Sequence, residues 1–417
     1  MTGNGPELDV LVAGASAAGL EAARRLAKAG RRVAVLDARR EEAHGADRTW
    51  IVTRTFTDVL DELPGDAVVH ETDVMRLASP GAEAEVRLDP ADLIVERSVL
   101  LAGLAERARA AGARVRFGRR VDDVRRVGDG WRVRVDVRRD GAEAEARPEG
   151  REDRGGAPAA GGGSGPDAAP ANPPDGHVLT ARHVIGADGV RSTVAGAVDL
   201  RHPPAVPLVQ ALVELPDGWD PAVTKVWFAP DDTPYFYWLI PESARRGALG
   251  IIAERDADAR GLLDRFLARR GLEARGYQAN LVALHRPVAR RERGRPGGPR
   301  ALLVGDAAGQ VKVTTVGGVV PGLMGGQAAA RALLRGTRYR RERAALRREL
   351  WLHDGIRWVM DRFGDREYDA LLGLLNGPLR RLVGRHSRDE MAARALDLLR
   401  AQPRLVGLGL RALVPGR

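Results

Sequence analysis

The segment Gly14-Ala-Ser16-Ala-Ala-Gly19 has residue types and a spacing that could bind a phosphate-containing ligand. It follows a short apolar run, Leu8 to Ala13, and precedes an Ala- and Leu-rich stretch, so we expect a strand, a turn and a helix. Gly14 allows a tight turn, the small Ser16 lets the backbone approach a pyrophosphate, and Gly19 permits close packing of the helix on the strand. Because a helix N-terminus favours anions, the phosphates would lie there.

A carboxylate follows the glycine-rich turn at the sequence separation that is typical of a ribose-binding acid. Residues Arg32 to Asp37 read as a second strand, and Asp37 comes 23 residues after Gly14. An acid at this position accepts hydrogen bonds from the ribose of an adenosine. Ser16 replaces the usual middle glycine, but the strand, turn, helix, strand and acid are all in register, which makes the pattern specific. It predicts a βαβ unit with a parallel sheet, without separating NAD from FAD.

Two distant segments decide between these cofactors. Gly186-Ala-Asp188-Gly189-Val-Arg-Ser192 ends an apolar strand, His177 to Ala187. A second glycine-rich segment, from Gly305-Asp306 to Gly317-Gly318, follows the buried strand Ala301 to Val304 and precedes a helix. In this order the residues resemble the FAD-dependent flavoproteins of the aromatic-hydroxylase superfamily, and particularly its geranylgeranyl reductase branch.

The resemblance implies that FAD is the cofactor. Asp306 would bind the ribityl chain, and the Gly317-Gly318 turn would place a helix N-terminus, which favours negative charge, at the pyrimidine edge of the flavin. Asp188 would support the cofactor near its pyrophosphate, although its type also suits a simple capped turn. The implied cofactor-binding residues are Gly14, Ser16, Ala17, Ala18, Gly19, Asp37, Arg97, Val121, Asp188, Gly305, Asp306, Gly317 and Gly318.

Two further site residues, Arg97 and Trp50, have alternative interpretations, and Val121 is assigned by the resemblance alone. The resemblance implies that Arg97 contacts a phosphate or ribose of the cofactor, a role that suits a planar guanidinium. The alternative is that Arg97 forms a surface salt bridge. Val121 matches a position that holds adenine through its backbone. Trp50 lies beyond Asp37, where it could line the flavin pocket or belong to the core.

The substrate side is predicted from an aromatic segment. Phe236-Tyr-Trp238-Leu-Ile-Pro241 resembles the reductase branch's substrate signature, with Phe236 where Tyr is usual. Phe236 and Trp238 could hold a polyprenyl chain by apolar burial, or could be ordinary sheet packing. The catalytic residues are not identified; Trp50, Trp238 and Lys312 are candidates. Lys312, one of three lysines, could place a cation beside the flavin.

These features predict an FAD-dependent oxidoreductase that reduces carbon–carbon double bonds of an isoprenoid or polyprenyl lipid or a quinone tail. The sequence contains no second dinucleotide fingerprint, so the reductant would be external, either NADPH or an electron-transfer protein. The alternatives are an aromatic monooxygenase, a lycopene-cyclase-like flavoprotein without net redox, and a flavin-binding fold without turnover. Halogenases of this superfamily need an early lysine near the flavin, and no lysine lies between Lys28 and Lys225.

The expected fold class is α/β, with a discontinuous, glutathione-reductase-like Rossmann domain for FAD formed by residues 1–200 and 290–335. An antiparallel β lobe for the substrate would comprise residues 201–289, and residues 336–417 would form a basic helical tail. Residues 139–176 are rich in Gly, Pro, Ala and charge, which predicts a disordered insertion.

The charge distribution limits the partners. Residues 331–417 hold 20 Arg against 10 Asp plus Glu, which accounts for the whole net charge of +10. Without a nucleic-acid motif or interleaved aromatics, we expect no nucleic-acid partner and instead a tail near a membrane or an anionic ligand. The chain has no Cys, and its eight His show no metal spacing, so no metal is expected. The N-terminus lacks a secretory pattern, which predicts a cytoplasmic protein that could associate with the membrane's cytoplasmic face.

Overall fold

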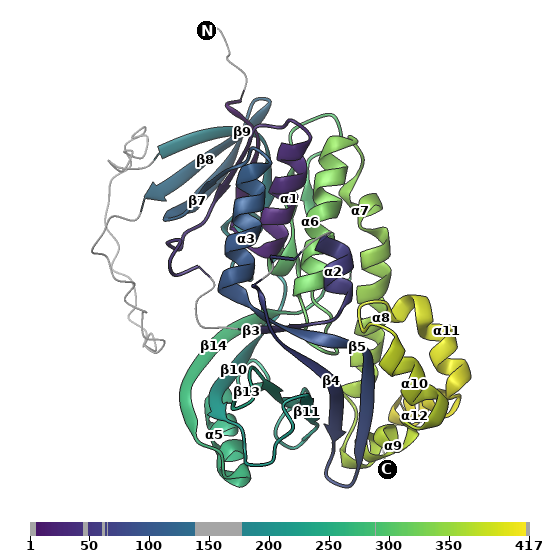
Figure 1. Cartoon of the computed structure of the whole chain (residues 1–417). Helices are drawn as coiled ribbons and strands as arrows, with labels where there is room; N and C mark the ends of the chain where they lie inside the picture. Colours follow the sequence, from purple (N-terminus) through teal and green to yellow (C-terminus); the bar gives the residue numbers. More distant parts are fainter. Residues whose placement is uncertain are drawn as a thin grey trace, which may run out of the picture.

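The structure is a computed structural model, and it describes residues 6–44, 49–60, 63–64, 66–137, 177–287 and 289–413. The described residues form two eight-stranded sheets and a group of C-terminal helices (Figure 1). The insertion expected at residues 139–176 lies outside the described residues.

The first sheet is built around β1 (Leu8–Ala13), which pairs in parallel with β2 (Val33–Leu36) and β9 (His177–Gly186). Its residues are almost all buried, as expected for a central parallel strand covered on both faces. The sheet continues through β6 (Arg114–Arg116) on one side and, on the other, β16 (Ala301–Leu303) and the antiparallel edge strand β15 (Glu292–Arg293). The strands β7 (Arg119–Val127) and β8 (Gly130–Val137) extend from β9 and pack, with α4 (Thr193–Ala197), over the second face.

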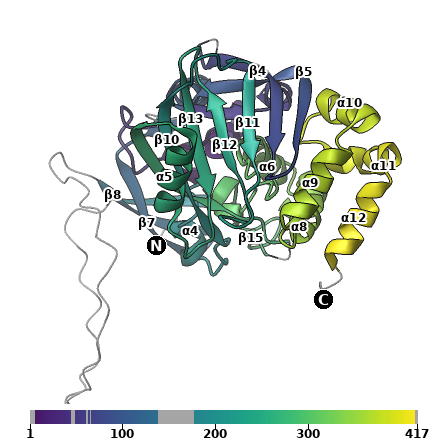
Figure 2. The same cartoon turned by 90° about the horizontal axis from the view of Figure 1, so that it is seen from below.

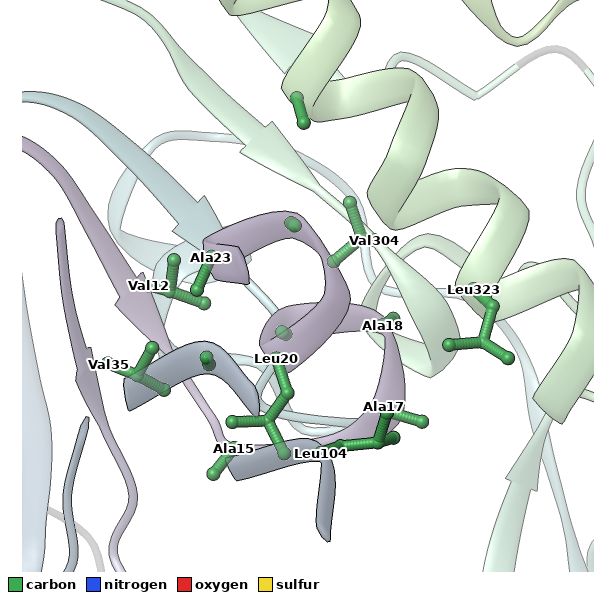
Figure 3. Close-up of a cluster of buried hydrophobic side chains, with 14 of the residues drawn as sticks. Val12, Ala15, Ala17, Ala18, Leu20, Ala23, Val35, Leu104, Val304 and Leu323 are labelled. Carbon is green, nitrogen blue, oxygen red and sulfur yellow. The ribbon is translucent and has the colours of Figure 1, made fainter. Parts of the chain in front are cut away.

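Three helices cover the first face of this sheet, namely α1 (Ala17–Lys28), α3 (Arg97–Ala110) and α6 (Val319–Leu334), which lie side by side in Figure 1. Small residues allow α1 and α6 to approach closely, since a Cβ on Gly326 would lie 2.2 Å from the Ala18 carbonyl oxygen. Figure 3 shows the core beneath them, where Ala17 and Ala18 face Leu323. The short helix α2 (Thr55–Leu60) packs against α6, and the 3₁₀ turn η1 (Gly305–Ala308) follows β16.

The second sheet has the order β14-β10-β13-β12-β11-β4-β5-β3. Its strands are β3 (Thr49–Val52), β4 (Val68–Ala78), β5 (Glu83–Glu96), β10 (Ala205–Glu214), β11 (Val223–Trp227), β12 (Tyr237–Pro241), β13 (Arg246–Ile252) and β14 (Ala274–Ala283). The helix α5 (Ala259–Arg270) packs on its outer face.

The second sheet takes its strands from two separate parts of the sequence. Three of its strands, β3 to β5, come from residues 49–96, which the sequence analysis assigned to the FAD-binding domain. They join the later strands through a parallel pair in which Val74 of β4 lies opposite Val223 of β11. A pairing between segments so far apart leaves no local pattern in the sequence, and it is also the exception in an otherwise antiparallel sheet.

The C-terminal helices pack beside the second sheet (Figure 2). They are α7 (Tyr339–Glu342), α8 (Ala344–Met360), α9 (Asp365–Leu374), α10 (Gly377–Arg385), α11 (Met391–Ala401) and α12 (Arg404–Leu413). A Cβ on Gly384 would lie 2.2 Å from the Arg87 carbonyl oxygen, so α10 rests directly on β5. Residues 336–413 are therefore a packed part of the molecule, and among the described helices none is long and apolar enough to cross a membrane.

Candidate functional site

A cavity of about 1260 Å³ is lined by residues of both sheets and of the C-terminal helices. Its volume exceeds the roughly 300–1,000 Å³ of ordinary small-molecule sites, so it can hold a large cofactor together with a substrate. Of the candidate cofactor, substrate and catalytic residues that the sequence analysis proposed, Gly19 alone is not on its wall. The residues on the wall are Gly14, Ser16, Ala17, Ala18, Asp37, Trp50, Arg97, Val121, Asp188, Phe236, Trp238, Gly305, Asp306, Lys312, Gly317 and Gly318.

The turn between β1 and α1 is pressed against the end of β9. Gly14 has a φ of +98°, and a Cβ there would lie 2.4 Å from the Ala187 carbonyl oxygen, so both the dihedral angle and the space require glycine. Ser16 is the N-cap residue directly before α1, and its hydroxyl accepts a hydrogen bond from the Gly19 amide at 3.3 Å. Gly19 itself packs against the Gly14 carbonyl and Ala187. The first turn of α1 thus borders the cavity with its amide-rich end.

Asp37 braces this turn from the end of β2. One carboxylate oxygen accepts from the Ala15 amide at 2.8 Å and the other from the Arg39 amide at 2.8 Å. Each oxygen retains further acceptor capacity, so the carboxylate can also receive ribose hydroxyls. His44 lies 3.7 Å from it; burial lowers the pKa of His44, although the charge of Asp37 opposes this shift. The sequence analysis did not single out His44.

Asp188 caps the short helix α4. It accepts from the Ser192 hydroxyl at 2.6 Å and from the Val194 amide at 3.2 Å. Burial raises the pKa of its carboxyl group despite these hydrogen bonds. This geometry is the capped turn that the sequence allowed, and the residue also lines the cavity.

Arg97 and Trp50 form one unit of the wall. Arg97 is the first residue of α3, and its guanidinium carbon lies 5.3 Å from the centre of the Trp50 ring. A cation over an aromatic face is an attractive arrangement. It holds the β3 indole and the α3 guanidinium together beside the cavity that both residues line.

The loop from Gly305 to Gly318 carries two charged side chains across its own backbone. An Asp306 carboxylate oxygen lies 3.2 Å from the place where a Cβ of Gly318 would be, and the Lys312 Cε lies 3.2 Å from that of Gly317. The absence of side chains at Gly317 and Gly318 therefore leaves room for both, directly before α6 begins at Val319.

Lys312 is buried and forms an ion pair with Asp389, which precedes α11. Asp389 also accepts a hydrogen bond from the Thr53 hydroxyl at 2.5 Å. Burial would raise the pKa of Asp389, but Lys312 and Thr53 offset this effect and the pKa lies below its ordinary value. The sequence analysis missed Asp389 because it lies in the segment interpreted as a tail.

The other part of the cavity is apolar. Phe236 and Trp238 meet edge to face with ring centres 6.0 Å apart. Trp238 lies opposite Gly250 of β13, where a Cβ would be 2.2 Å from the indole. Glycine at this position is what lets the large ring lie flat on the sheet. The apolar side chains that complete this wall are Met75, Leu77, Leu208, Val226, Phe228, Ile240, Ile252, Ile356, Met360 and Met391.

The residues present fit FAD. The α1 turn offers amides to a pyrophosphate, Asp37 can accept from a ribose, and the α6 N-terminus faces the cavity at Gly317-Gly318. In addition, the hydroxyl oxygen of Thr315 is buried in the cavity wall without a hydrogen-bond partner, which suits a polar ligand edge at this point. The described part of the chain contains no group of acidic and histidine side chains that could hold a metal ion.

Comparisons with known proteins agree with this cofactor. An FAD-binding-domain family model matches residues 7–149. Digeranylgeranylglycerophospholipid reductase 2 of Methanothermobacter thermautotrophicus is 33% identical over 215 residues, which cover 46% of this chain and 54% of that relative. The match thus spans about half the length of the curated relative.

Solved structures share the fold over nearly the whole chain. A geranylgeranyl bacteriochlorophyll reductase-like protein from Thermoplasma acidophilum has a TM-score of 0.70 at 16% identity, covering 96% of this chain and 99% of that one. A flavin-dependent brominase has a TM-score of 0.64 at 13% identity, covering 94% and 99%. The chain therefore carries an FAD-binding domain in a fold similar to that of geranylgeranyl reductase-like flavoproteins, and FAD is its cofactor.

Proposed function

We propose that this protein is an FAD-dependent oxidoreductase that reduces carbon–carbon double bonds of an isoprenoid or polyprenyl lipid or of a quinone tail. The observation that carries the proposal is the cavity, because one continuous space joins the residues expected for FAD to a wall of aromatic, aliphatic and methionine side chains. Such a wall binds a long hydrocarbon chain by burial, at roughly 25 cal/mol per Å² of apolar surface. The name of the curated relative, a reductase of a geranylgeranyl lipid, supports the same substrate class.

One set of residues would bind the cofactor, and another set would bind the substrate. The α1 turn with Asp37 would hold the adenosine and pyrophosphate, and Asp306 with the α6 N-terminus would hold the ribityl chain and the pyrimidine edge. Bound and reduced FAD supplies a hydride. The wall around Trp238 would orient the double bond and exclude water. The second hydrogen arrives as a proton, and Lys312, which lines the cavity, is a candidate donor.

Two partners complete the proposal. The reductant is external, either NADPH or an electron-transfer protein, since the sequence offers one dinucleotide fingerprint. The substrate reaches the protein from a membrane surface, with which the arginine-rich C-terminal helices associate peripherally. Their exposed apolar side chains support this: Trp351, Trp358, Leu396, Leu399, Val406 and Leu410.

An anaerobic assay tests the reaction. The FAD-loaded protein is reduced chemically and mixed with polyprenyl lipids of increasing length, and the products are analysed by mass spectrometry. Reduction adds two hydrogens for each double bond. A product of unchanged mass would indicate isomerisation or cyclisation, and a product that gains oxygen only in air would indicate a monooxygenase. A fully saturated lipid is the matched control, and an unchanged polyprenyl panel would contradict the proposal.

A further inference from the structure

Three consecutive residues between α10 and α11 reach from the C-terminal helices to the cavity. The Ser387 hydroxyl donates to the Thr53 hydroxyl at 3.0 Å, and Thr53 in turn donates to Asp389. Arg388 forms an ion pair with Asp92 of β5, and Asp389 forms one with Lys312. Arg388, Asp389, Asp92, Thr53 and Lys312 all line the cavity. The loop after α10 thus supplies charged groups to the wall on which the flavin is expected.

Lys312 lies at the positive end of α6. Its Nζ is 3.5 Å and its Cε 3.2 Å from the place of a Gly317 Cβ, and its amide donates to the Gly317 carbonyl at 3.0 Å. Asp306 occupies the corresponding place over Gly318. The ammonium therefore adds to the partial positive charge of the helix N-terminus. A positive charge at the α6 N-terminus stabilises negative charge on the part of the cofactor that lies beside it.

We infer that Asp389 and Lys312 form a buried pair of opposite charges beside the α6 N-terminus, and that the balance of these two charges sets the redox potential of the bound FAD. Reduction adds negative charge to a flavin, and a nearby cation stabilises that charge more strongly in a buried site than in water. The carboxylate of Asp389 acts in the opposite sense. The potential thus depends on the balance of the two charges in this buried pair. The loop before α6 contributes Lys312, and the loop before α11 contributes Asp389.

The environment of the pair makes this balance specific. Lys312 and Asp389 have side chains that are 7% and 2% exposed, so water screens neither charge well. The neighbouring charges, Arg388 and Asp92, neutralise each other. Removing one member of the Lys312–Asp389 pair therefore leaves one uncompensated charge beside the α6 N-terminus.

The test is a double-mutant cycle on the two-electron midpoint potential of the bound FAD, measured by equilibration with a redox dye. Asp389→Asn should raise the potential and Lys312→Met should lower it, each changing the ratio of reduced to oxidised flavin at least tenfold, which is about 30 mV. The double variant should return close to the parent, and Asp389→Glu should retain the parent potential. Lys225→Met is the matched control, because Lys225 pairs with Glu83 at 2.8 Å and lies outside the cavity.

Several outcomes would overturn the inference: unchanged potentials in both single variants, shifts in the same direction, or a double variant that matches Lys312→Met. Bound flavin and thermal unfolding are recorded for every variant. If Asp389→Asn fails to fold, the comparison of Lys312→Met with the double variant still decides the question, since the latter leaves no unpaired charge. The measurement uses no substrate, so it rests on FAD binding and is independent of the proposed reaction.

Discussion

At the scale of single residues, Gly14 and Gly30 form a natural matched pair. Both have a positive φ, of +98° and +76°, but a Cβ at Gly14 would strike the Ala187 carbonyl while one at Gly30 would meet nothing within 4 Å. Gly30→Ala should therefore cost only backbone strain, about 1–2 kcal/mol. Gly14→Ala should cost more and abolish retention of FAD. Urea unfolding and the flavin content of purified protein measure both effects; equal losses in the two variants would contradict this account of the turn.

Asp306 provides a second residue-scale prediction. Asp306→Ala should weaken FAD binding by about 1.5–3 kcal/mol, the contribution of a hydrogen bond to a charged group. Titration of the apoprotein with FAD, followed by quenching of flavin fluorescence, gives the dissociation constant. Asp264→Ala is a suitable control, because Asp264 lies on the outer helix α5 and pairs with Arg260. An Asp306→Ala protein that binds FAD as tightly as the parent would remove this residue from the proposed site.

The sequence predicted the residues of local motifs but not their long-range partners. Gly14, Asp37 and Asp306 belong to patterns in which each glycine or acid has a role within its own turn. The choice of Asp389 as the partner of Lys312 depends on how the C-terminal helices dock, and no local spacing encodes it. Trp50 shows the same limit, since its stacking with Arg97 depends on the β3–β5 pairing.

At the scale of elements, the apolar pattern of the sequence predicted β1, whereas glycine and proline content is a poor predictor of α6. The strand expected at Leu8 to Ala13 is β1 with the same bounds. The helix that the resemblance places after the Gly317-Gly318 turn is α6, which begins at Val319. Its first turns contain Pro321 and several glycines, which are the residue types with the lowest helix propensity. However, Pro is tolerated in a first helical turn, Gly322 lies close to Gly305 and to Ala18 of α1, and Gly326 packs on the backbone of Ala18.

The strand β9 carries a pH-sensitive group. His183 accepts a hydrogen bond on Nδ1 from the Arg300 amide at 3.1 Å, and burial, with help from Arg300, lowers its pKa from 6.5 to about 4. The unfolded chain thus takes up a proton near pH 6.5 that the folded chain resists until about pH 4. The free energy of unfolding should therefore decrease as the pH is lowered through this window, by about 2–3 kcal/mol between pH 7 and 4.5.

His183→Asn isolates this contribution. Asparagine retains a hydrogen-bond acceptor but does not titrate, so the variant should lose less stability than the parent between pH 7 and 4.5. Urea unfolding at several pH values gives both curves. Parallel curves for the two proteins would show that His183 is not the responsible group.

The helix α8 separates the cavity from the surface. Ile356 and Met360 line the cavity, whereas Trp351 and Trp358, seven residues apart and thus on one face, are 64% and 52% exposed. Exposed tryptophans beside arginines favour a lipid interface. The full-length variant Trp351→Ser/Trp358→Ser should therefore sediment less with anionic vesicles. Tyr277→Ser, at another exposed aromatic residue, should sediment like the parent, and equal sedimentation of all three proteins would contradict the proposed association.

At the scale of the whole molecule, composition predicted a helical, basic C-terminal region but not its place. Arginine-rich helices suit a solvated tail as well as a packed one, because the long side chain can lie along a surface with its charge in water. The structure places this region against β5 and gives it Arg388, Asp389 and Met391 on the cavity wall. Deleting residues 338–417 would therefore damage the site as well as any membrane surface, and point variants are the appropriate test.

The Arg388–Asp92 ion pair tests how firmly this region is joined to the rest of the molecule. Asp92 is 5% exposed, so Arg388→Met would leave a buried carboxylate without its partner. Removing one member of a buried pair typically costs about 3–5 kcal/mol, and the loss should appear as a lower free energy of unfolding in urea.

Arg275→Met removes an arginine from an exposed pair with Glu214 and should cost no more than about 1 kcal/mol. The double variant Arg388→Met/Asp92→Leu should recover most of the loss, because it removes the stranded charge. A loss no larger than that of Arg275→Met would mean that apolar packing alone holds the C-terminal helices on the second sheet.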